Sequence, residues 1–149
     1  KRSSAKLQPV LDTCQLAVEL GIHIEITYLI IPGQNDTPEE LKNFSKWVAD
    51  DLNINVPIHF SRFHPDFKFK KVQGTPMETL YMAHRTAKEA GLKHVYLGNI
   101  MHCDEENTYG PDCGTLAMER IGLRLVKDKT NDGKCGSCGS DLDIILSPK

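Results

Sequence analysis

Three predicted helices alternate with three predicted strands between residues 7 and 99 of this 149-residue chain. The helices are expected at 7–20, 37–53 and 75–91, and the strands at 22–31, 56–62 and 95–97. Strands separated by helices of about 10–15 residues pair in parallel through right-handed crossovers. The pattern therefore predicts an α/β fold. Because three strands are few for a complete α/β sheet, we expect the end of a larger barrel.

Two of the predicted helices begin with a threonine that is followed three residues later by a glutamate. Thr37 and Glu40 form one such pair, and Thr75 and Glu78 form the other. In a capping box of this kind, each side chain bonds a backbone N–H of the helix start. Because helix N-termini attract anions, a small α/β anion binder that uses Thr37 and Thr75 is one candidate function.

The first two strands place apolar and polar residues on opposite faces. The apolar face holds Ile22, Ile24, Ile26, Ile58 and Phe60, and the polar face holds His23, Glu25, Thr27, His59 and Ser61. In a βα barrel the outward face of each strand packs against the helices, while the inward face fills the lumen. A polar inward face therefore indicates a ligand cavity. The alternative is a sheet with one face in water.

The residue pattern changes after Asn99. Residues 100–112 are polar and rich in turn formers, and short strand patterns follow at 116–121, 123–126 and 144–146. We therefore expect two parts, 1–102 and 103–149. The second part is predicted to be a small β-rich tail in which Gly122 turns a hairpin.

The tail carries four of the five cysteines. Cys135 and Cys138 form a Cys-x2-Cys-Gly knuckle, whose two thiolates can reach one tetrahedral metal ion. Cys113 is also followed by glycine, but Gly110 stands where its partner cysteine would be. These residues predict a zinc-ribbon-like site with three thiolate ligands. A ribbon that has lost its metal and a redox cysteine pair are the alternatives.

The fourth ligand of this site is predicted to be Cys103 or His102, if the intervening loop folds back. Cys14 lies in the apolar stripe of the first helix, so we expect it to be a buried small hydrophobe. An odd number of cysteines does not suit a secreted disulfide framework. We therefore expect a reducing cytoplasm.

Composition excludes two further classes. Eighteen basic and twenty acidic residues give a net charge of -2. A nucleic-acid-binding surface would show a basic excess, so none is expected. No apolar run approaches the roughly 18–20 residues that cross a bilayer, so we expect no membrane partner.

Four segments have a distinctive sequence: EITYLIIPGQND at 25–36, HFSRFHPD at 59–66, YLGN at 96–99 and ENTY at 106–109. Together they resemble the radical S-adenosylmethionine (SAM) enzymes of the AmmeMemoRadiSam system. Those enzymes are similar in turn to the pyruvate formate-lyase activating enzymes. The resemblance covers nearly the whole chain, and its SRFHPD, GN and ENTY elements are the most specific.

The resemblance implies that this chain is the C-terminal part of a partial (β/α)6 barrel, followed by a zinc-ribbon-like tail. Such a barrel holds SAM against a 4Fe–4S cluster, which reduces SAM and releases a 5′-deoxyadenosyl radical. The cavity residues are then Glu25, Thr27, His59, Ser61, Arg62, His64 and Asn99. His64 would lie near SAM, or alternatively cap Asp66. Arg62 would meet SAM or substrate, or form an ion pair at the barrel rim.

The chain departs from the family in its cysteines. The cluster motif Cys-x3-Cys-x2-Cys is absent, and Gly110 replaces the first cysteine of the family's tail motif Tyr-Cys-Pro-x-Cys-Gly. The Asp-x-Lys segment of an earlier strand is missing too. We therefore expect this chain to be inactive alone and to need the missing N-terminal half of the barrel. A protein is a further candidate for its substrate or partner. The alternative function is a zinc-binding protein-interaction module without catalysis.

Overall fold

The computed structural model describes residues 6–100 and 103–146. Its elements before residue 100 are α1 (Leu7–Glu19), β1 (Ile26–Ile30), α2 (Pro38–Trp47), η1 (Val48–Leu52), β2 (Ile58–Arg62), η2 (Phe67–Phe69), α3 (Met77–Glu89) and β3 (Val95–Gly98). Segment η1 is a π-helical turn that continues α2. The helix–strand order is the predicted one, and the mixed α/β fold is confirmed.

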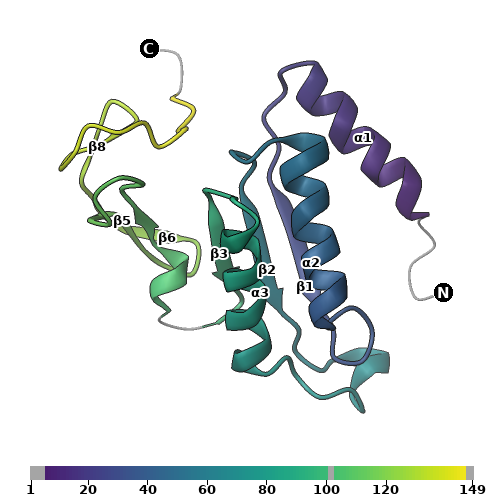
Figure 1. The fold of residues 1–149 in the computed structure, drawn as a ribbon. Helices are drawn as coiled ribbons and strands as arrows, with labels where there is room; N and C mark the ends of the chain where they lie inside the picture. Colours follow the sequence, from purple (N-terminus) through teal and green to yellow (C-terminus); the bar gives the residue numbers. More distant parts are fainter. Residues whose placement is uncertain (1–5, 101–102, 147–149) are drawn as a thin grey trace.

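The three strands form one parallel sheet in the order β1-β2-β3. Ile26 pairs with Ile58, and Ile58 pairs with Val95, so the strands run in register. Helices α2 and α3 pack against each other over the sheet, and α1 lies beyond α2 (Figure 1). Crossovers of one hand between neighbouring strands bring successive helices to the same face.

The face of the sheet toward the helices is apolar, and the opposite face is polar. Ile58 and Phe60 on β2 are fully buried, whereas His59 and Ser61 between and after them are only half-buried. The same core contains the fully buried side chains of Ile30, Leu41, Val48 and Leu80. Each such side chain contributes about 1.5–3 kcal/mol by leaving water. The alternation predicted for this strand is confirmed.

The first strand is shorter than predicted. It begins at Ile26, and Ile22 is 55% exposed rather than packed under the helices. The partner strand is preceded by Pro57, which has no N–H to extend the ladder toward residue 22. The prediction for Ile22 is therefore wrong. The prediction for Cys14 is also wrong, because this cysteine is half-buried and α1 packs on the core through Val18.

Thr37 caps α2 as predicted. Its hydroxyl accepts from the Glu40 N–H, and the Glu40 carboxylate accepts from the Thr37 N–H. The carboxylate of Glu40 thus already lies at this helix N-terminus, where an external anion would have to bind. The capping box is confirmed, but it disfavours an anion site at Thr37.

Thr75 does not cap α3, whose N-cap is Pro76. The hydroxyl of Thr75 is fully buried and donates to the Ile30 carbonyl at 2.6 Å, while it accepts from the Phe63 N–H at 2.8 Å. The predicted second capping box is wrong because the core offers this hydroxyl two backbone partners. Thr75 ties the ends of β1 and β2 to the start of α3.

The tail forms two small antiparallel sheets. Its elements are η3 (Asp104–Glu106), β4 (Thr108–Tyr109), β5 (Leu116–Ile121), β6 (Arg124–Asp128), β7 (Thr130–Asn131) and β8 (Lys134–Cys135). Strand β5 lies between β4 and β6, and β7 pairs with β8. The hairpin through Gly122, which has a φ of 58°, is confirmed.

The strand predicted at 144–146 is not formed. Asp143 has a φ of 53°, which turns the chain away from an extended path just before this run. Ile144 instead packs on a small core of Ala117, Cys135 and Leu142. Within the parts of the chain that the structure describes, no helix has the length and apolar character needed to cross a membrane.

Replacing Thr75 by valine should destabilise the protein by about 1–3 kcal/mol, because the N–H of Phe63 and the carbonyl of Ile30 would lose a buried partner. The free energy of unfolding, measured by chemical denaturation, checks this. Thr86→Val on α3 is the matched control, since Thr86 is only half-buried. Equal stability of the Thr75 variant and the control would contradict the role given to Thr75.

Candidate functional site

A cavity of about 1290 Å³ lies over the polar face of the sheet. Both the strands and the tail contribute to its wall. Five of the seven predicted cavity residues line it: Glu25, His59, Arg62, His64 and Asn99. Thr27 and Ser61 are not part of the lining. Thr27 is exposed on β1, and Ser61 is half-buried on β2. The structure therefore brings most of the predicted polar residues to one hollow.

At one end of the cavity, Glu25 joins two histidines. Its carboxylate lies 2.7 Å from Nε2 of His59 and 3.4 Å from Nε2 of His23. Burial alone would raise the pKa of Glu25, but the hydrogen bonds and charges of His59 and His23 outweigh burial and hold this pKa below its usual range. The carboxylate stays ionised and orients the His59 ring, which stacks on Tyr96 at 5.3 Å.

At the carboxyl ends of the strands, three predicted residues form a small network. Arg62 donates through Nε to the Thr75 carbonyl at 3.0 Å, and Asn99 donates through its amide to the Arg62 carbonyl at 2.8 Å. His64 lies with Nε2 3.1 Å from the Asn99 carbonyl. Asn99 has a φ of 59°, a strained conformation that is common at functional sites.

The network contains neither of the structural alternatives named for Arg62 and His64. Among the described residues, Arg62 forms no ion pair, and its recorded partner is a carbonyl. His64 contacts Asn99, whereas the Asp66 carboxylate accepts from the Phe67 N–H. Neither the rim ion pair nor the His64–Asp66 cap is formed, so both side chains remain at the cavity.

Tyr96 and Arg120 are among the cavity residues that sequence reasoning missed. The Tyr96 hydroxyl lies 3.1 Å from the Thr108 hydroxyl, and the Arg120 guanidinium lies over the Tyr96 ring at 5.6 Å. Tyr96 alternates with buried Val95 and Leu97, so the strand period could have indicated it. Arg120 comes from the tail, and no local pattern relates it to the sheet.

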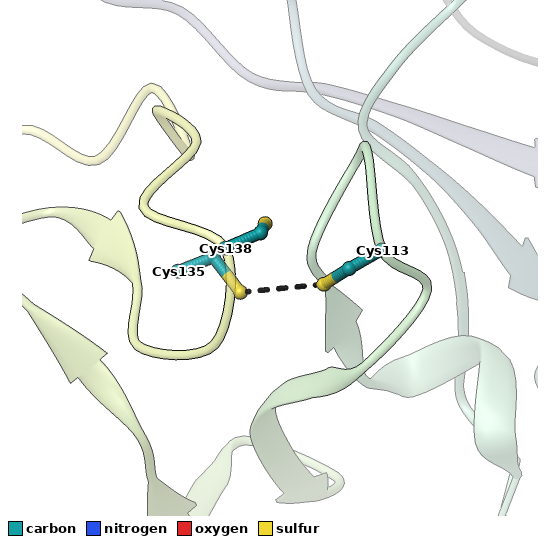
Figure 2. A group of neighbouring side chains, drawn as sticks. All are labelled: Cys113, Cys135 and Cys138. Carbon is teal, nitrogen blue, oxygen red and sulfur yellow. Dashed lines mark hydrogen bonds between the residues drawn. The ribbon is translucent and has the colours of Figure 1, made fainter.

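A second candidate site lies in the tail. The Sγ atoms of Cys113, Cys135 and Cys138 all lie within 4.8 Å of one another and can hold a metal ion. Cys135 and Cys138 come from one loop and Cys113 from the loop that faces it (Figure 2). Cys113 and Cys135 have their sulfurs 3.8 Å apart. Tetrahedral ligands at a zinc–sulfur distance of about 2.3 Å are separated by about 3.8 Å, so the spacing suits a single ion.

Of the two residues predicted as the fourth ligand, Cys103 is not in place. Cys103 lies outside the three-cysteine group, and its thiol donates to the Glu105 carboxylate at 2.6 Å. Burial, with Glu105 beside it, raises the pKa of Cys103 to about 12, which disfavours the thiolate that a metal requires. His102, the other predicted ligand, lies outside the described residues. In contrast, hydrogen bonding to Ser140 lowers the pKa of the Cys138 thiol to about 7.

Replacing Cys113 by serine should weaken metal binding, because a ligand is removed. Substitution of residues that only hydrogen-bond to the ligands lowers metal affinity by roughly 10–100-fold, and the loss here should be larger. Metal affinity and stoichiometry, measured by competition with a chromophoric chelator, check this. Cys103→Ser is the matched control and should leave both values unchanged. A large loss of metal affinity in the Cys103 variant would show that Cys103 is a ligand.

Replacing Glu25 by glutamine should cost no more than about 1 kcal/mol at neutral pH, because the pair with His59 is partly exposed. Since the pKa of Glu25 is lowered in the folded protein, its stabilising effect is present above the usual glutamate range and is lost as the pH falls through the folded value. The difference in unfolding free energy between wild type and Glu25→Gln should therefore decrease as the pH falls, and it should vanish below the folded pKa of Glu25. Glu89→Gln, at the exposed end of α3, is the control. A difference that stays constant as the pH falls below this pKa would contradict the ionised pair.

Comparison with known proteins identifies a longer archaeal relative. No family model matches the chain. A protein of Methanocaldococcus jannaschii, described as "Uncharacterized protein MJ0808", is 45% identical over 148 residues. The similar region covers 98% of this chain and 44% of that protein. The chain thus spans less than half the length of the relative that it matches.

Proposed function

We propose that this chain is the C-terminal part of a radical SAM enzyme of the activating-enzyme type, and that it forms one wall of the cavity that binds SAM and substrate. The observation that carries the proposal is the convergence of Arg62, His64 and Asn99 with the Glu25–His59 pair on one cavity. Ligands of parallel α/β sheets bind at the carboxyl ends of the strands, where Arg62 and Asn99 lie.

The one-sided sheet supports a place within a larger barrel. The helices cover the apolar face, and the polar face is left to line a hollow, which is the division expected of strands around a lumen. The Methanocaldococcus jannaschii relative is more than twice as long as the region it shares with this chain. That length leaves room for further βα units and for the cluster-binding half, which we assign to a separate part of the polypeptide.

The volume of the cavity and the polar groups that line it are suited to SAM. A volume of about 1290 Å³ exceeds the roughly 300–1,000 Å³ of ordinary ligand pockets, so it has room for SAM together with a substrate. Arg62 offers guanidinium N–H groups, while His64 and the amide of Asn99 offer further polar contacts. Bound SAM would supply the radical chemistry, and these residues would position it and exclude water.

The tail cysteines are not proposed as ligands of the catalytic cluster. Their sulfurs are spaced for one ion, whereas the thiolates of a 4Fe–4S cluster bind different irons and are farther apart. We propose zinc for the tail, in a site that fixes the two loops to each other. Metal in the tail and SAM in the cavity are therefore separate parts of the proposal.

The longer protein, reconstituted anaerobically with iron and sulfide, should cleave SAM to 5′-deoxyadenosine in the presence of a strong reductant, whereas this chain alone should not. Replacing Arg62 or His64 by alanine should lower kcat/KM for cleavage by about 10–100-fold, because misplaced substrates react slowly. Product formation, followed by chromatography, measures both.

Arg85→Ala is the matched control for Arg62→Ala, since Arg85 lies exposed on α3. It should change the rate by less than about twofold. SAM cleavage by the 149-residue chain alone, or equal rates for the Arg62 and Arg85 variants, would contradict the proposal.

A zinc-binding protein-interaction module is the second candidate, and the three-cysteine group favours it. Strand β6 adds to this, because all five of its residues are exposed at the edge of a sheet, where a partner strand can pair. Monodisperse, zinc-dependent folding of this chain without any cleavage activity in the longer protein would favour the module over the enzyme.

A further inference from the structure

The two loops that carry the metal-binding cysteines share a pattern of backbone hydrogen bonds. In loop 135–140, the Cys135 N–H donates to the Ser140 carbonyl, and the Gly139 N–H donates back to the Cys135 carbonyl, both at 2.8 Å. Gly139 has a φ of 76°, which closes the turn. The first residue of this loop is a cysteine whose thiol belongs to the metal-binding group.

Loop 110–115 repeats this pattern with glycine in the first position. The Gly110 N–H donates to the Thr115 carbonyl, and the Gly114 N–H donates back to the Gly110 carbonyl, again both at 2.8 Å. Gly114 has a φ of 64°. Gly110 therefore occupies, in its loop, the place that the ligand Cys135 occupies in the other.

The side chain that Gly110 lacks would point at the sulfurs. A Cβ at this position would lie 2.6 Å from Sγ of Cys113 and 2.6 Å from Sγ of Cys135. Metal–sulfur bonds of about 2.3 Å put a bound ion in the same small space. Because both distances are shorter than a carbon–sulfur contact allows, no side chain fits at residue 110 while the two sulfurs keep these positions. Residue 110 therefore supplies no ligand to the ion.

The carboxylate of Asp112, in the same loop as Cys113, bonds to Ser140. Ser140 Oγ donates to Asp112 at 2.5 Å, and the same hydroxyl lies 3.0 Å from Sγ of Cys138. Asp112 is not part of the group whose ligand atoms lie within 4.8 Å of one another. Among the described residues, three thiols are therefore the ligands that the fold presents together.

We propose that a metal ion bound by Cys113, Cys135 and Cys138 keeps its fourth coordination position, on the side of Gly110, for a small ligand from solution. That ligand is a water molecule that a small thiol can displace; the thiol then binds as thiolate, and water and the thiol proton are released. Zinc sites with three protein ligands and an open position are reactive, whereas four-cysteine sites are structural. The inference requires metal binding by the tail and does not depend on radical SAM chemistry.

Titration of the cobalt-loaded protein with 2-mercaptoethanol tests the proposal, because cobalt reports its ligands in the visible spectrum while zinc is silent. The wild type should show a saturable change in its cobalt absorption bands. Gly110→Cys places a fourth thiol at the position equivalent to Cys135, and it becomes a ligand once the sulfurs of Cys113 and Cys135 shift away from its Cβ. This variant should bind zinc at least about tenfold more tightly and should not respond to the added thiol.

Gly98→Cys is the matched control, since it adds a cysteine on β3, where a Cβ meets nothing within 4 Å. It should keep the wild-type response. If Gly110→Cys does not fold, X-ray absorption of the zinc-loaded wild type prepared without added thiol decides. Three sulfurs and one lighter atom that becomes a fourth sulfur on addition of 2-mercaptoethanol support the proposal, and a ligand set that the thiol leaves unchanged contradicts it.

Two results would overturn the inference. One is a wild type that binds no cobalt under conditions that exclude other thiols. The other is a cobalt-loaded wild type whose bands do not respond to 2-mercaptoethanol. In the second case, a response restored by Asp112→Asn would identify Asp112 as the fourth ligand. Neither result bears on SAM cleavage by the longer protein.

Discussion

One-sided burial of a three-stranded parallel sheet is the constraint on which the rest of the molecule depends. Side chains of β2 alternate between the helix-covered core, which holds Ile58 and Phe60, and the open face, which holds His59 and Ser61. Because the period of a strand is two residues, burying the first pair necessarily presents the second pair on the other face. The polar cavity is thus a direct consequence of how the core is packed.

The cavity also depends on contacts between the sheet and the tail. Nε2 of His94, at the start of β3, lies 2.9 Å from the Asp143 carboxylate, and His94 is only 8% exposed. Farther along β3, Tyr96 meets Thr108 and Arg120. These contacts hold the tail beside the open face, so that residues distant in sequence form a common wall. Without them the polar face would be a flat surface in water, one of the two arrangements that its alternation allows.

The group of three cysteines that can hold a metal ion obeys a different constraint, since it depends on the geometry of two loops. Two loops with the same hydrogen bonds face each other, and their glycines after Cys113 and Cys138 adopt positive φ values that close each turn. Two such loops can supply four ligands in tetrahedral positions, and this chain fills three of them with sulfur. The Gly110 loop has the backbone hydrogen bonds of the Cys135 loop, although glycine occupies its first position.

Sequence patterns determined the order of helices and strands, the capping of α2, the polar face and the three cysteines that can hold a metal ion, because each of these rests on local periodicity or on short spacing. Tertiary structure alone decided the rest. Thr75 was predicted to cap a helix but bonds two backbone groups in the core. Cys103 was predicted to bind the metal but bonds Glu105. Arg120 reached Tyr96 because the tail folds against β3. Such outcomes depend on contacts between residues that are distant in the sequence, and the spacing of residues along the chain carries no information about those contacts.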